Sequence, residues 1–137
     1  AYTVFFAEAV DVESVAVMQN LFADEPAAVE EAFEAFKDTL TGCLVPEQTM
    51  LEDGVVSTAV AETFEGPAVG EDRFAVVFRS ESDFGDVVRR TAERLVIFRQ
   101  GPVLAGVKVG VSGAGEDLAL TEDDVAQIIE AAAANLP

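Results

Sequence analysis

Residues Val88–Ser112 read VRRTAERLVIFRQGPVLAGVKVGVS, two β-prone runs separated by the pair Gln100–Gly101. Valine, isoleucine and phenylalanine favour strands, and a pair that contains glycine supplies a tight turn. The pattern therefore predicts a hairpin of two antiparallel strands, roughly Val88–Arg99 and Val103–Ser112.

Further strands are predicted on the N-terminal side of this hairpin. Val55–Phe64 and Arg73–Arg79 are β-prone, and the polar stretch Ser80–Asp86 supplies a longer connection to the hairpin. Short links between successive strands favour a meander. At the start of the chain, Tyr2–Val10 and Ser14–Phe22 also read as strands.

A first helix is predicted between Asp24 and Gly42. Asp24 can cap it, Pro26 suits the first turn, and Gly42 ends it. Four apolar residues follow at spacings of four, three and four, and therefore share one face: Val29, Phe33, Phe36 and Leu40.

A second helix is predicted to start at Thr121, whose hydroxyl can cap it, with three acidic residues in its first turn. Its apolar stripe consists of Val125, Ile128, Ile129, Ala132 and Leu136. The preceding residues, Gly113–Asp117, are expected to form a flexible loop.

These elements predict a single α+β domain over residues 1–137, with a twisted, mostly antiparallel sheet of five to seven strands and two main helices packed on it. The length suits one core, and the 50% hydrophobic content excludes a disordered chain.

Acidic residues outnumber basic ones by 26 to 8, giving a net charge of -18. Such a chain repels nucleic acids and anionic membranes, since binding them requires clustered bases. No apolar run approaches the length of a spanning helix, so we expect no membrane insertion by this segment. The chain begins at Ala1, which suggests a mature product or an excised domain.

The sequence contains few of the residues and motifs that catalysis commonly uses. It has no histidine, which excludes histidine-dependent triads and histidine metal ligands, and Cys43 has no partner for an internal disulfide. We expect Cys43 to be a half-buried small apolar residue. The glycines match neither a phosphate-loop nor a dinucleotide-binding pattern, and the acidic clusters lack calcium-loop spacing. We therefore expect no enzyme activity, no cofactor and no metal site, with a carboxylate-dependent hydrolase as a third possibility.

Seven of the eight bases lie between Arg73 and Lys108. On neighbouring strands they could gather into a patch that binds a carboxylate or phosphate. Alternatively, they pair with nearby acids across the sheet, among them Glu62, Glu81 and Glu93.

The predicted ligand-binding residues are Arg89, Arg90 and Arg94. Along the strand, Arg90 and Arg94 share one face with Val96, while Arg89 lies on the other. The segment near Arg89 is polar on both faces, so we expect it to project beyond the covering helices.

The order of features resembles a known family. An apolar strand with an acidic turn (Val15–Asp24) precedes an Ala/Phe-rich helix that ends near a cysteine (Ala27–Cys43). A Pro-x-x-Gly-Glu step (Pro67–Glu71), an Arg-x-Gly hairpin (Arg99–Gly101) and an Ala-rich terminal helix ending at Leu136 follow. This order resembles the extracellular sensor-like domain of actinobacterial Ser/Thr kinases of the PknH type and related secreted lipoproteins.

The resemblance implies a non-enzymatic, extracytoplasmic module of the cell envelope, secreted or anchored, with a ligand-binding cleft between sheet and helices. Cys43 matches a position where such domains often place a disulfide cysteine, but no second cysteine exists here. We expect a ligand-binding or sensing module whose partner is an unknown small molecule or an acidic protein. The alternative is a structural or protein-interaction domain of a secreted lipoprotein that binds no small molecule.

Overall fold

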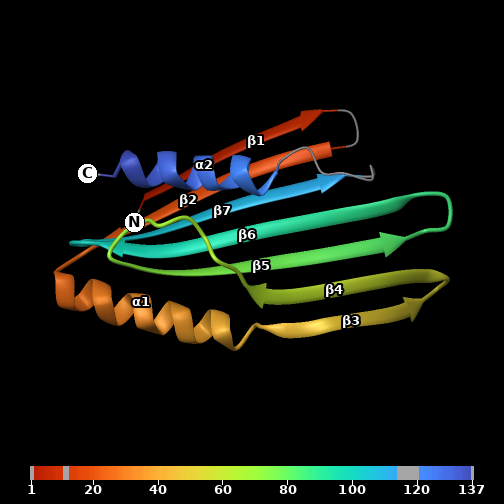
Figure 1. The fold of residues 1–137 in the computed structure, drawn as a ribbon, viewed down its shortest axis with the longest axis horizontal. Coiled ribbons are helices and arrows are strands. Elements are labelled where there is room, and N and C mark those ends of the chain that lie inside the picture. The colour runs from red at the N-terminus through yellow and green to blue at the C-terminus, as the bar shows by residue number, and fades with distance from the viewer. Residues whose placement is uncertain (1, 11–12, 114–120, 137) are drawn as a thin grey trace.

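The computed structural model describes residues 2–10, 13–113 and 121–136, and its strands form one twisted sheet (Figure 1). The sheet order is β1-β2-β7-β6-β5-β4-β3, and all neighbours are antiparallel. The strands are β1 Tyr2–Val10, β2 Glu13–Ala23, β3 Val45–Glu52, β4 Val55–Thr63, β5 Asp72–Asp83, β6 Val88–Gln100 and β7 Val103–Gly113. The helices are α1 Pro26–Thr41 and α2 Glu122–Ala134.

The α+β class and the meander are confirmed. Strands β3 to β7 follow one another across the sheet, and the β1–β2 hairpin adds to the free side of β7 (Figure 1). Gly101 turns the chain between β6 and β7 with a φ of 57°, a value that favours glycine.

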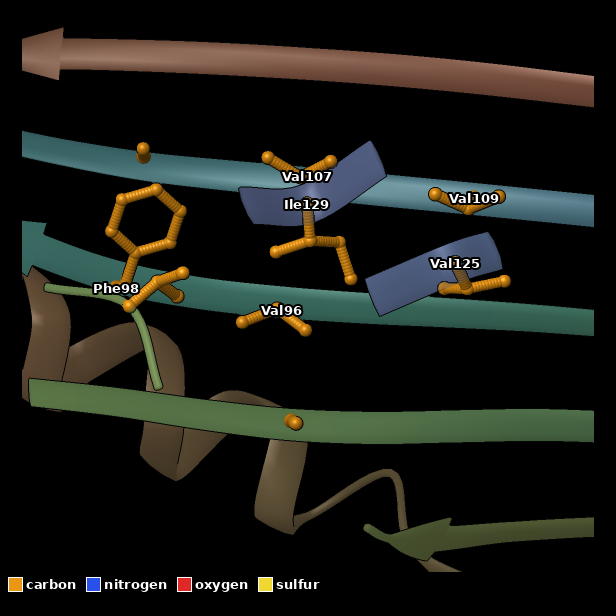
Figure 2. Packing of buried hydrophobic residues seen from close by; sticks show 9 residues of the cluster. Val96, Phe98, Val107, Val109, Val125 and Ile129 are labelled. Atoms are coloured by element: carbon orange, nitrogen blue, oxygen red, sulfur yellow. The ribbon is translucent and has the colours of Figure 1, made fainter. Parts of the chain in front are cut away.

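The two helices cover opposite faces of the sheet. Because strand side chains alternate, Val96 and Phe98 of β6 point to one face and Ile97 to the other. Val96 and Phe98 pack with Val125 and Ile129 of α2, as Figure 2 shows, whereas Ile97 packs with α1. We call these sides the α2 face and the α1 face.

The α2 face holds the larger buried cluster. Its members come from β5, β6, β7, α2 and the segment before β5: Val69, Ala75, Val96, Phe98, Ala105, Val107, Val109, Val125 and Ile129. On the α1 face, the predicted stripe of α1 supplies Val29 and Phe33, which are buried against Ile97 and Leu104. Phe36, predicted on the same stripe, is 55% exposed.

The helix starts differ in how well they match prediction. Thr121 caps α2 as expected, with its hydroxyl accepting from the Asp124 N–H while the Asp124 carboxylate accepts from the Thr121 N–H. The Asp24 cap was wrong: Glu25 is the N-cap, without a side-chain cap bond, and Asp24 accepts from the Glu25 N–H. Helix α1 ends at Gly42 as predicted. The loop predicted over Gly113–Asp117 falls largely on residues 114–120, outside the described residues.

Strand β3 was not predicted. It is an edge strand, exposed along its whole length, and its pairing with β4 shifts register between Val45 and Gln48, around Pro46. Proline is tolerated on an edge strand because no neighbour needs its missing N–H.

Ion pairs of Arg99 connect the segment before β5 to the β6–β7 turn. Its guanidinium contacts Glu71 at 2.7 Å and Asp72 at 2.7 Å, and Glu71 also accepts from the Gly101 N–H. The hydrogen bond to Asp72 raises the pKa of Arg99. Beside this contact, Gly70 has a φ of 68°, and a Cβ there would lie 2.6 Å from the Arg99 carbonyl oxygen.

Candidate functional site

The structure separates the three arginines that sequence reasoning grouped. Arg90 and Arg94 lie on the α2 face, since they alternate in phase with Val96, and Arg89 lies on the α1 face. Arg89 is exposed, as expected, and its side chain forms no hydrogen bond or ion pair with another described residue. One ligand therefore cannot contact all three guanidinium groups from a single face.

An open groove lies across the β3–β6 side of the sheet, and we call it the polar groove. Its volume is about 840 Å³. Its lining comes from the start of β3 and from β4, β5 and β6: Leu44, Val45, Pro46, Glu47, Thr58, Val60, Ala61, Glu62, Thr63, Arg79, Ser80, Glu81, Arg90, Thr91 and Ala92.

Each arginine of this region already has a carboxylate partner. Arg90 donates to Glu81 at 2.9 Å and Arg79 donates to Glu62. The alternative in which the bases pair with nearby acids is thus confirmed for Glu81 and Glu62, while Glu93 forms no ion pair with a described residue. Sequence reasoning did not select Arg79, although its same-face position opposite Ala92 follows from strand alternation.

Arg94 is 9% exposed and is the most buried charged residue among those whose side chains the structure describes. One of its terminal nitrogens lies 3.2 Å from Glu122 in the first turn of α2, and its Nε has no hydrogen-bond partner among the described residues. A buried guanidinium held this way ties β6 to α2. Its position favours a structural role over ligand contact.

A second groove lies on the α1 face, and we call it the apolar groove. It runs between α1 and strands β2, β7 and β6, with a volume of about 750 Å³. Its lining is Asn20, Leu21, Phe22, Ala32, Phe36, Thr39, Leu40, Leu95, Ile97, Leu104, Ala105 and Gly106. Phe22 is 39% exposed and Phe36 55% exposed, so two aromatic rings remain open to solvent here.

Gly106 leaves space beside this groove. A Cβ built there would meet only Ile97, at an ordinary 3.7 Å, and the backbone has no positive φ that would demand glycine. A glycine inside a strand weakens it and often marks a bulge, a tight bend, or a site where a ligand or another backbone approaches closely. Two features of the sequence could have indicated this groove. One is Gly106, which lies between valine-rich segments, and the other is Phe36, at the margin of the apolar stripe of α1.

Lys108 lies next along β7 on the same face as Gly106. It pairs with Leu95, a lining residue, on one side and with Met18 on the other. Lys108 is half-buried and forms no ion pair with a described residue.

Cys43 is exposed, so the prediction of a half-buried thiol was wrong. It lies between the end of α1 and the exposed strand β3. In the described part of the chain, no three Cys, Asp or Glu side chains come together in a way that could hold a metal ion. Neither α1 nor α2 is long and apolar enough to span a membrane.

The chain matches no protein-family model, and a search of curated proteins found no match.

Proposed function

We propose that the chain is a non-enzymatic ligand-binding or sensing module that works outside the cytoplasm, with the apolar groove as its ligand site. The observation that carries this proposal is an open hollow of about 750 Å³ with apolar walls and two exposed phenylalanines. Small-molecule sites are typically concave, of this size, and mostly apolar with few polar groups. The extracytoplasmic location rests on the resemblance to sensor-like domains alone.

The polar groove is the weaker site because its arginines are neutralised within the protein. A ligand there would have to displace Glu81 from Arg90 or Glu62 from Arg79. Ligand contact by Arg90 and Arg94 stays a prediction for a polar ligand, and Arg89 would serve only a partner on the α1 face.

The test uses a neutral apolar dye, N-phenyl-1-naphthylamine, whose fluorescence increases in apolar surroundings. We expect saturable binding near one dye per chain. Gly106→Val should block it, because the added methyl groups enter the groove, whereas Gly110→Val should not. Gly110 is a matched control on the same strand and face; it does not line the groove, and its Cβ would meet Glu93 at an ordinary 3.5 Å. Equal binding by both variants, or no saturable binding by the wild type, would exclude the groove as the ligand site.

A protein-interaction domain is the second candidate, favoured by the edge strand β3. Leu51 is 73% exposed and pairs across the hairpin with Val56, which is 43% exposed. Exposed apolar side chains on a free edge promote strand pairing with another chain. Sedimentation would show self-association that Leu51→Lys abolishes; a monomer at all concentrations would leave no support for pairing between copies.

A further inference from the structure

We propose that the ligand of the apolar groove is a long-chain carboxylate, with its hydrocarbon chain beside α1 and its carboxylate at Lys108. This inference rests on the proposed function, since it names the ligand class of the same groove.

The walls of the groove select an apolar chain. Phe22 and Leu104 come from neighbouring strands and Phe36 from α1. No acidic residue contributes to the lining, although the chain carries 26 carboxylates. The α1 residues that line it are Ala32, Phe36, Thr39 and Leu40, so the acidic positions of the helix do not line the groove. An unbranched chain placed there removes apolar surface from water on both sides of the contact.

The missing side chain at Gly106 makes room for such a chain close to the strand. The nearest atom to a Cβ at this position is a methyl carbon of Ile97, so a Cβ has room there, and the backbone has no positive φ that would strain a larger residue. Valine would also suit a strand better than glycine does. Position 106 therefore carries a glycine that neither the packing within the protein nor the backbone conformation requires, although another residue would stabilise the strand more.

Lys108 supplies the charge that would recognise the head group. Two residues along a strand advance about 6.6 Å, which places Lys108 one same-face position beyond Gly106, next to Leu95 in the lining. Its ammonium forms no ion pair with a described carboxylate, unlike Arg79, Arg90, Arg94 and Arg99. In a protein of net charge -18, a cation without such a partner beside an apolar groove is complementary to a ligand with one negative end.

The experiment compares dodecanoate with dodecanol, both kept below the concentrations at which they self-associate. The two ligands share one hydrocarbon chain and differ at the head group. Displacement of the dye and isothermal titration calorimetry would give both affinities for the wild type, Gly106→Val, Lys108→Met and Lys108→Arg.

Lys37→Met is the control for charge, because Lys37 lies over the Phe74 ring at 5.9 Å and does not line the groove. It changes the net charge by the same amount as Lys108→Met.

We expect both ligands to bind the wild type and Gly106→Val to weaken both by at least about tenfold. Lys108→Met should weaken dodecanoate by roughly three- to tenfold and leave dodecanol unchanged. Lys108→Arg should retain dodecanoate, and Lys37→Met should change neither ligand.

If both ligands bind in the groove but Lys108→Met affects neither, the carboxylate assignment is wrong while the ligand-binding function stands. If the wild type binds the dye but neither ligand, the long-chain assignment is wrong while the ligand-binding function stands. If Gly106→Val retains both ligands and the dye, the proposed function fails together with this inference.

Discussion

Replacing Ile129 with alanine is expected to lower the free energy of unfolding by about 3–4 kcal/mol. Ile129 is fully buried and packs onto the sheet beside Val125, in the cluster that Figure 2 shows. The change removes three carbons, worth about 2.5 kcal/mol at about 0.8 kcal/mol each. A residual cavity adds about 1 kcal/mol, because β6 and β7 are fixed by their neighbours and cannot close onto the gap.

The assay is equilibrium urea unfolding followed by circular dichroism, with Ile128→Ala as the control. Ile128 precedes Ile129 on α2 but is only half-buried, so its truncation should cost about 1 kcal/mol. Both substitutions introduce the same residue in the same helix, and helix propensity therefore cancels. Equal losses in the two variants would refute the packing of α2 described above.

Three further outcomes are expected. Thr121→Ala should cost about 1 kcal/mol in the same urea assay, because it removes the cap of α2; an unchanged midpoint would contradict the capping geometry. Gly70→Ala should lower the free energy of unfolding by more than about 2 kcal/mol, because Gly70 has a positive φ and a Cβ there would crowd the Arg99 carbonyl. Gly54→Ala should lower it by only about 1 kcal/mol, because its φ is also positive but a Cβ there meets nothing within 4 Å. Similar melting temperatures for the two variants would speak against the contact at Gly70. Arg90→Glu should lower stability by about 1 kcal/mol or less, since it breaks a partly exposed pair with Glu81, and Arg89→Glu should leave the melting temperature unchanged; a large loss at Arg89 would show a structural role.

Local signals explain which elements could be predicted from the sequence. The β6–β7 hairpin is marked by Gly101 between two β-prone runs, and the start of α2 by Thr121 and its acidic first turn. In both cases the residues that decide the structure are neighbours in sequence, so the pattern carries the information.

Strand β3 was missed because an edge strand needs no apolar alternation. Its residues are exposed throughout, and a proline such as Pro46 is not expected in a central strand. The available signal was the pair Asp53–Gly54, with φ values of 51° and 79°, which is the residue pair that tight hairpin turns prefer.

The candidate sites depend on which helix covers which face, and the sequence pattern does not specify this. Alternation separates Arg89 from Arg90, yet only the packing of α2 brings Glu122 to Arg94. In the same way, the apolar groove exists because α1 lies to one side of Gly106 and leaves Phe36 half out of the core.

The position of the β1–β2 hairpin has a consequence for how the protein folds during synthesis. Strand β2 pairs with β7, so that Ser14 meets Ser112 and Ala23 meets Val103. Strand β2 is synthesised before β7, so it can pair early with β1 but must wait for β7 before the hydrogen bonds on its other side can form. Such distant pairing slows folding, because the loop must close before its contacts contribute. We expect the meander β3–β7 to assemble first and the N-terminal hairpin to join it in a slower kinetic phase, which a β2 substitution would retard without changing the earlier one.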